Sequence, residues 1–288
     1  MLAIYKRELK SYFQSMIGYA FIAFLMLFMG IYFTAYNLNS GYPYFSYVLS
    51  STMFIFLVAV PVLTMKCFAE ERKSKTDQLL LTAPVNVFEI VLGKYFAMVT
   101  VFLVPVILSC IYPLVIKAQG VSYLKVDYAA ILMYFAIGCV YIAIGMFLSA
   151  LTESQIIAVV STFATLLVLY LWSGVLSFLP SEPIYNLIGV IVIILLIGYL
   201  IYDITKNWVI GGGIMAAGTL ACVITYLVNS SKYSSLLATW LGKLDFATML
   251  DGVISNNLFD VSNLVVCASV VFLLVFLTVQ TIQKRRWS

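Results

Sequence analysis

Long apolar stretches alternate with short polar ones along most of the chain. A helix needs roughly 20 apolar residues to cross a bilayer, because the hydrocarbon core is about 30 Å thick and each residue adds about 1.5 Å. Eight stretches reach this length, at about 17–36, 48–69, 92–116, 128–150, 156–179, 184–202, 208–228 and 262–282. The pattern therefore predicts an all-α polytopic membrane protein that forms a single transmembrane domain over residues 1–288.

Residues 2–15, before the first span, have the pattern of an amphipathic helix that lies in the membrane interface. Its apolar positions recur at helical spacing: Leu2, Tyr5, Leu9, Tyr12 and Phe13. Charged residues fall mostly between them: Lys6, Arg7, Glu8 and Lys10. A signal peptide is the alternative, but the apolar run that follows is long and lacks a small-residue cleavage site, so we expect retention.

The segment 70–94, between the second and third spans, combines charges, a proline and two helix-start signals. Ser74 followed by Asp77 has the spacing of a capping box and predicts a short helix over 75–82, which Pro84 ends. Asn86 and Glu89 repeat the pattern at the start of the third span. Within that span, Pro105 and Pro113 predict a bend, and a gating hinge is the sharper alternative.

The short helix over 75–82 would carry an apolar face formed by Leu79, Leu80 and Leu81. Such a face suits a groove on a partner protein, whereas the alternative is a surface helix that packs on its own bundle.

A second turn, at 151–155, joins the fourth and fifth spans. Thr152 and Gln155 have capping-box spacing, and Glu153 suits the positive end of the new helix, so a tight helical hairpin is predicted. Residues 229–261 are too polar to span a membrane, and they predict short amphipathic or re-entrant helices on one face.

Composition supports the membrane class and argues against an enzyme. Charged residues form 10% of the chain, against about 25% in soluble domains. The chain has no histidine, the commonest metal ligand and general base, so no catalytic, cofactor-binding or metal site is predicted. The five cysteines lie in or beside apolar segments and are expected to pack as small hydrophobic side chains.

The distribution of basic residues predicts the topology. With both termini in the cytoplasm, twelve basic residues face the cytoplasm and four face outside, in agreement with the positive-inside rule. The twelve are Lys6, Arg7, Lys10, Lys66, Arg72, Lys73, Lys75, Lys94, Lys206, Lys284, Arg285 and Arg286. The segment 70–91 and the 151–155 turn are then cytoplasmic, and 229–261 lies outside. The net charge of +4 is not a signal for nucleic-acid binding.

An energy source within the chain is not evident. Gly93-Lys94 and Gly242-Lys243 both lack the earlier glycine and the following Ser or Thr of a phosphate-binding loop. The interiors of the spans are nearly free of charge, which gives little support to ion-driven transport. We therefore expect the energy to come from another protein.

The chain resembles the membrane subunits of type-2 ABC exporters, especially the gliding-motility-associated permease branch. The resemblance lies in KRELKSYFQSMIGY near the start, the 70–94 segment, GMFLSALTESQIIA at 145–158, and the closing residues Phe246, 252–254 and 284–287. It departs from the family at Lys75, where a glycine is usual, and in the extra pair of spans over 184–228.

This resemblance implies a coupling helix at 75–83 that sits on a separate cytoplasmic ATPase. The implied coupling residues are Glu70, Glu71, Arg72, Lys75, Thr76, Asp77, Leu79, Leu80, Thr82 and Pro84. Glu70 and Glu71 would lie near the basic residues of the interfacial helix and form weak, partly exposed ion pairs.

The resemblance also implies the assembly and its location. Two ATPase subunits would hold ATP and Mg²⁺ and pair with two permeases, either two copies of this chain or one copy and a homologue, in the plasma (inner) membrane. Export is the expected function. A membrane anchor or assembly factor that recruits a cytoplasmic partner without transport is the alternative.

Overall fold

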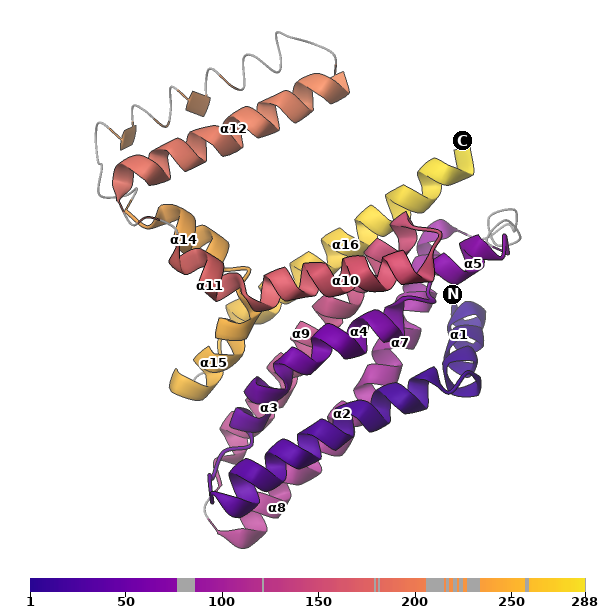
Figure 1. Ribbon diagram of the computed structural model, residues 1–288, viewed down its shortest axis with the longest axis vertical. Coiled ribbons are helices and arrows are strands. Elements are labelled where there is room, and N and C mark those ends of the chain that lie inside the picture. The colour runs from indigo at the N-terminus through magenta and orange to yellow at the C-terminus, as the bar shows by residue number, and fades with distance from the viewer. Residues whose placement is uncertain are drawn as a thin grey trace. The chain divides into compact units, whose positions relative to one another are not determined.

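The computed structural model describes residues 1–76, 86–120, 122–178, 180, 182–205, 215, 218, 219, 222, 225, 226, 234–256 and 259–287. Every regular element among these residues is a helix, which confirms the predicted all-helical class (Figure 1). The chain forms two compact units: Met1–Tyr170 together with Phe246–Ser288, and Leu171–Asp245.

Five helical stretches among the described residues are long and apolar enough to cross a membrane. They are Ile17–Asn39, Ser46–Lys73, Val87–Gln119, Leu124–Leu151 and Val261–Arg285. Shorter apolar helices occur at Gln155–Tyr170, Pro183–Val192 and Phe246–Ser255. Most of the span predicted over 208–228 lies outside the described residues, so the count of eight stays a prediction.

The first unit contains most of the helices. Its N-terminal half holds α1 (Leu2–Gln14), α2 (Ile17–Phe33), η1 (Thr34–Asn39), α3 (Ser46–Thr52), η2 (Met53–Ile55), α4 (Phe56–Thr64) and α5 (Ala69–Lys73). The remainder holds α7 (Val87–Ser109), α8 (Ile111–Gln119), α9 (Leu124–Leu151), α10 (Gln155–Tyr170), α15 (Phe246–Asn256) and α16 (Val261–Trp287).

The third span is interrupted at one of its two prolines. Pro113 has no amide hydrogen to donate to the carbonyl one turn earlier, so a continuous helix would lose that bond. The helix is interrupted at Cys110, so Pro113 lies in the first turn of α8. Backbone amides in a first turn have no carbonyl partner within the helix, so the amide hydrogen that proline lacks is not needed there. Pro105 lies inside α7 and does not interrupt it.

Helix α9 lies at the centre of the first unit and contacts α4, α7, α10, α15 and α16. Two glycines let neighbouring helices approach it closely. A Cβ atom at Gly145 would lie 2.3 Å from Thr64 Oγ1, and one at Gly138 would lie 2.2 Å from Phe102 Cε1. Small residues serve close helix packing inside a membrane, where no hydrophobic force draws helices together.

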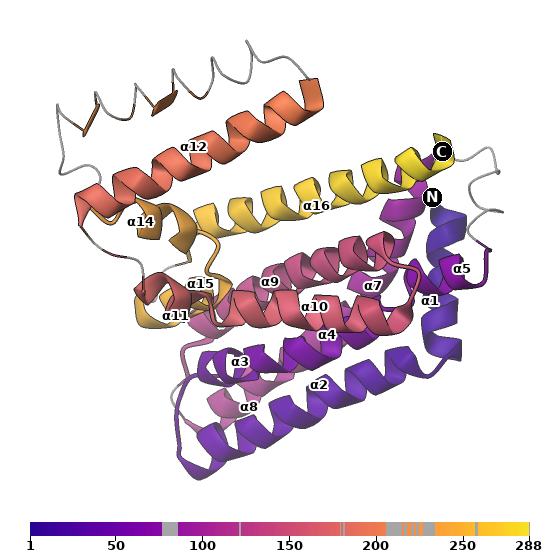
Figure 2. The same cartoon turned by 45° about the horizontal axis from the view of Figure 1, so that its top comes forward.

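One end of the first unit brings together α1, α5, the α9–α10 turn and the C-terminal end of α16, as both views show (Figures 1 and 2). Arg72 donates to the carbonyl of Thr152 at 3.5 Å, and Arg285 forms an ion pair with Glu153. These are the segments that the charge count assigns to one compartment.

The other end of this unit is aromatic. Tyr44 and Tyr123 stack with ring centroids 4.5 Å apart. Beside them the buried Asp127 accepts a hydrogen bond from the backbone amide of Ser46 at 3.1 Å. Because this amide starts α3, Asp127 supplies a cap from a different helix.

The second unit contains α11 (Trp172–Ser177), α12 (Pro183–Thr205) and α14 (Leu236–Gly242). The indole of Trp172 donates to the carbonyl of Leu241 at 2.8 Å, which ties α11 to α14. The buried Asn186 donates to the carbonyls of Pro180 and Glu182, and its own carbonyl accepts from the amide of Leu237 at 3.2 Å.

Two sequence expectations change here. The helix expected over 156–179 is divided at Leu171, where α10 has ended and α11 has not begun. The segment 229–261 does form short helices, but α14 belongs to the second unit and α15 to the first.

Candidate functional site

The end of the second span is held by a hydroxyl group from α9. After α4 ends at Thr64, the chain turns and begins the short helix α5 at Ala69. Ser149 Oγ accepts hydrogen bonds from the amides of Phe68 and Ala69, both at 3.2 Å, and donates to the carbonyl of Met65 at 3.4 Å. A single buried hydroxyl therefore satisfies the first amides of α5 and fixes its direction.

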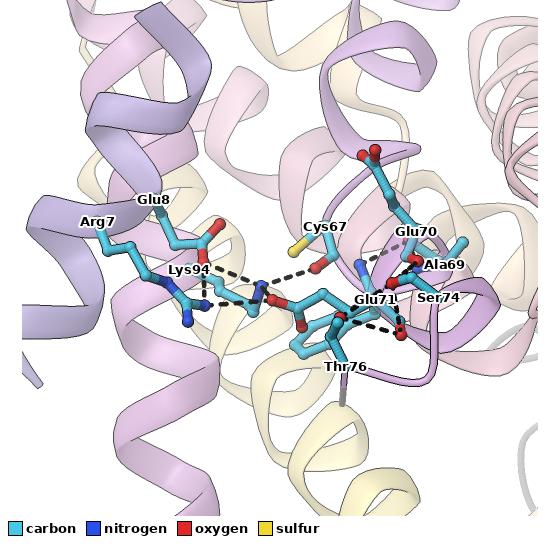
Figure 3. A network of polar contacts seen from close by, with 11 residues as sticks. Arg7, Glu8, Cys67, Ala69, Glu70, Glu71, Ser74, Thr76 and Lys94 are labelled. Atoms are coloured by element: carbon cyan, nitrogen blue, oxygen red, sulfur yellow. Dashed lines mark hydrogen bonds and ion pairs between the residues drawn. The ribbon is translucent and has the colours of Figure 1, made fainter. Parts of the chain in front are cut away.

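Four charged side chains meet where α1, α5 and α7 converge, and we call Arg7, Glu8, Glu71 and Lys94 the Lys94 cluster (Figure 3). The Lys94 ammonium lies 2.9 Å from Glu71 Oε1, 3.3 Å from Glu8 Oε1 and 2.9 Å from the carbonyl of Cys67. Its side chain is only 2% exposed. A buried cation of this kind persists because three acceptors surround it.

Arg7 completes the cluster from its solvent-facing side. Its guanidinium donates to Glu8 Oε1 at 2.7 Å and to Glu71 Oε1 at 3.2 Å. The hydrogen bond to Glu8 raises the pKa of the Arg7 guanidinium, and burial opposes this shift to a smaller extent. Each carboxylate is thus shared by two cations, which links α1 to both other helices.

The approach of α1 to α7 depends on Gly93, the residue before Lys94. A Cβ atom at Gly93 would lie 3.2 Å from Ile4 Cγ2 and 3.4 Å from the carbonyl oxygen of Met1. This contact is tighter than a side chain normally makes, so the missing Cβ lets α1 lie against α7. Glu8, one turn further along α1, can then reach Lys94.

The turn after α5 differs from the predicted helix start at Ser74. The Ser74 hydroxyl donates back to the carbonyl of Glu70 at 2.9 Å and bonds to Thr76 Oγ1 at 2.9 Å. Lys75 has a left-handed backbone with φ 57°, so it cannot be the first residue of the helix predicted over 75–82. Ser74 closes α5 instead of opening a new helix.

Several predicted coupling residues lie outside the described residues. They are Asp77, Leu79, Leu80, Thr82 and Pro84, in the gap between Thr76 and Asn86. Glu70, Glu71, Arg72, Lys75 and Thr76 are described and lie together at the end of the second span.

The second predicted capping box, at Asn86 and Glu89, is wrong, because neither side chain makes the bond that a capping box requires. Asn86 precedes the first residue of α7 but makes no capping bond with its side chain. Glu89 accepts from the ammonium of Met1 at 2.6 Å instead of reaching back to Asn86. The charged group of Met1, just before α1, replaces the local backbone amide as the partner of Glu89, because a charge-assisted hydrogen bond is roughly twice as strong.

The α9–α10 turn is as short as expected, but its capping box is also wrong. Helix α10 begins at Gln155, and the carbonyl of Ser154 accepts from the amide of Ala158 at 3.0 Å. Thr152 is therefore too early to cap this helix, and its hydroxyl bonds to the Ser154 carbonyl at 3.4 Å. Glu153 pairs with Arg285.

Comparison with protein families decides the class of the chain. Residues 31–279 match a family model described as ABC-2 family transporter protein. The chain belongs to this family. No curated protein matches it.

The ABC-2 permease is a component of membrane transport and not itself a catalyst. The match names the broad family and does not distinguish the gliding-motility branch, which stays a prediction. It begins after α1, so the Lys94 cluster joins Glu71 and Lys94, inside the matched region, to Arg7 and Glu8 before it.

Lys94 is the residue that the sequence analysis missed as part of the permease's site. The ion pair expected between Glu71 and the basic residues of α1 is present, from Arg7 at 3.2 Å. In the sequence, Lys94 stands at the end of the polar segment and contributes only to the count of cytoplasmic basic residues. Its position two turns inside α7 was the available signal, because an ionisable residue within a span usually has a partner. Lys6 and Lys10 are exposed and form no ion pair among the described residues.

Proposed function

We propose that this permease couples ATP hydrolysis on a separate cytoplasmic ATPase to the export of a substrate. The observation that carries the proposal is the burial of Lys94 between Glu71, at the end of the second span, and Glu8 on α1. A partner that presses on the 70–76 segment would meet a rigid junction of three helices. ATP and Mg²⁺ would bind the partner, in keeping with the lack of a phosphate-binding loop in this sequence.

The path of a displacement follows from the contacts. Movement of α5 would pass to α7 through Glu71 and Lys94, and to α1 through Glu71 and Arg7. It would pass to α9 through the Ser149 hydroxyl, which accepts from the first amides of α5. Breaking a buried ion pair by removing one partner costs about 3–5 kcal/mol, so the junction would move as one body.

The proposed orientation places the Lys94 cluster in the cytoplasm of a cell whose plasma membrane holds the permease. The count of twelve basic residues against four supports this choice. Both chain ends would then be cytoplasmic, beside the α9–α10 turn. We propose that two permeases, either two copies of this chain or this chain and a homologue, assemble with two ATPase subunits. Export is the direction that the resemblance favours.

The proposal is tested with the ATPase that co-purifies with this chain. ATP hydrolysis is measured in liposomes with the ATPase alone, with the wild-type permease, and with the variants Glu71→Gln and Lys94→Met. We expect the wild-type permease to change the hydrolysis rate and both variants to abolish that change while the complex stays assembled. A control variant, Lys10→Met, removes an exposed charge on α1 and should behave as wild type.

Two results would contradict the proposal. Unchanged coupling in both variants would remove the Lys94 cluster from the mechanism. Assembly of a complex whose hydrolysis never responds to the permease would favour the alternative of a membrane anchor without transport.

A further inference from the structure

A polar cavity lies beside the Lys94 cluster, between α1 and the end of the second span. Its volume is about 400 Å³, within the range of roughly 300–1,000 Å³ that small-ligand sites occupy. Three cations line it, Arg7, Lys66 and Lys94, and three carboxylates, Glu8, Glu70 and Glu71. Hydroxyl side chains from α1 and the 74–76 turn complete the lining.

The two signs of charge in this lining balance. A purely anionic ligand, such as inorganic phosphate, would meet as many carboxylates as cations and gain little. A zwitterion can place its anionic group against a cation and its cationic group against a carboxylate. The cavity therefore suits a ligand that carries both charges.

Lys66 and Glu70 have the spare bonding capacity that such a ligand needs. Their charged atoms are 3.8 Å apart, which is longer than a hydrogen bond, and their side chains are 32% and 49% exposed. The members of the Lys94 cluster, in contrast, satisfy one another at 2.7–3.3 Å. A phosphate could take donors from Lys66, and a primary ammonium could donate to Glu70.

An apolar path leads from the cavity along α2. Ser15 lines the cavity, and the next residue, Met16, is 77% exposed at the joint between α1 and α2. Tyr19, Leu27 and Ile31 are also exposed and apolar. They are separated by eight and four residues, which places them on one face of α2. In a membrane this face contacts acyl chains, so a headgroup in the cavity would have its chains beside α2.

We propose that this cavity binds the headgroup of a zwitterionic phospholipid with a primary amine, of the phosphatidylethanolamine type. The phosphate would lie against Lys66 and the ammonium against Glu70. A choline headgroup fits less well, because its quaternary ammonium has no hydrogen to donate to a carboxylate and is bound instead by aromatic cages. The inference rests on the chain being a membrane protein and is independent of the proposed ATPase.

The test uses the full chain, purified in a mild detergent, with phosphatidylethanolamine and phosphatidylcholine added at equal concentration. Native mass spectrometry counts the lipid molecules that stay bound. We expect phosphatidylethanolamine to be retained over phosphatidylcholine, and Lys66→Gln or Glu70→Gln to lower its retention about tenfold, or ~1.4 kcal/mol. Lys10→Gln, which removes a charge on α1 outside the cavity, should leave retention unchanged.

Further measurements distinguish a zwitterionic lipid from an anionic lipid and from a soluble compound as the ligand. Equal retention of the two lipids, or stronger retention of an anionic phosphatidylglycerol, would overturn the zwitterion assignment. Displacement by soluble glycerophosphoethanolamine, with no retained lipid, would show that the ligand is a free compound. Full retention in both variants, with melting temperatures as in wild type, would show that the lipid binds elsewhere.

Discussion

Two polar turns at the same end of the first unit are fixed in different ways. The 65–76 turn begins after α4 and includes the short helix α5, and the 152–154 turn joins α9 to α10. The first is held by Lys94, which is 2% exposed, and by the hydroxyl of Ser149. The second is anchored by an ion pair between Arg285 and Glu153, whose side chains are 38% and 67% exposed.

This difference bears on which turn is suited to transmit force. Solvent screens an exposed ion pair, and such a pair typically contributes about 0–1 kcal/mol to stability. The 152–154 turn can therefore change conformation at little cost in free energy. A buried cation with three acceptors resists separation much more strongly. The 65–76 turn is therefore the rigid one, although the sequence gives both turns the same capping signal.

The largest loss of stability is expected from Lys94→Met, which removes the buried cation that holds the 65–76 turn. Glu8 and Glu71 would then share Arg7 alone, and the carbonyl of Cys67 would lose its donor. We expect the free energy of unfolding in detergent micelles to fall by about 3–5 kcal/mol. The matched variant Lys10→Met should stay within about 0.5 kcal/mol of wild type, and equal losses in the two would refute the contrast.

Ser149→Ala tests the second support of the rigid turn. The amides of Phe68 and Ala69 would lose their acceptor inside the protein. We expect a loss of about 1–3 kcal/mol in the same unfolding assay. Ser269, on the exposed face of α16, donates to the carbonyl of Val266 in its own helix and has no other bond to a described residue, so Ser269→Ala should have little effect.

Lys75→Gly tests whether the backbone after α5 is left-handed at this position. Lys75 has φ 57°, a conformation that glycine adopts without steric cost. We expect an increase in stability of at most about 1 kcal/mol. Lys73→Gly, at the last residue of α5, should change stability in the opposite direction by at most about 1 kcal/mol, because glycine loses more conformational freedom in a helix than lysine does. Destabilisation by both would contradict the left-handed assignment.

The smallest effect is expected at the exposed turn. Arg285→Gln should lower stability by no more than about 1 kcal/mol, and salt should erase the difference because the pair is exposed. The measurement is unfolding at low and at high ionic strength. A salt-independent loss as large as that of Lys94→Met would remove the distinction between the two turns.

Much of the fold could be predicted from the sequence, because the length of an apolar run is set by the thickness of the membrane. The helical class follows from these apolar runs, and the short α9–α10 turn follows from the spacing of its polar residues. The pairing of Glu71 with α1 was implied by the resemblance to type-2 exporters. Bilayer thickness does not determine where a span breaks, so the division at Leu171 was not predicted.

The candidate site was less predictable, because it depends on helices that are distant in sequence. Lys94 on α7 pairs with Glu8 on α1, and Gly93 favours this pairing because it lets α1 lie close to α7. The capping signals at Ser74 and Asn86 were misread because other bonds replace those of the expected caps. The Ser74 hydroxyl donates back to the carbonyl of Glu70, and Glu89 accepts from the ammonium of Met1. Local patterns identified the segment but not its contacts.

The proposed function requires the segment after the second span to contact an ATPase. A photo-crosslinking residue placed at Lys75, which is exposed within the 65–76 turn, measures this contact directly in the cells that make the protein. The matched position is Lys125, exposed at the start of α9 near the aromatic end. We predict that an ATPase with a phosphate-binding loop is crosslinked from Lys75 and not from Lys125. Failure to capture such a protein from Lys75, or equal capture from both positions, would contradict the proposed contact.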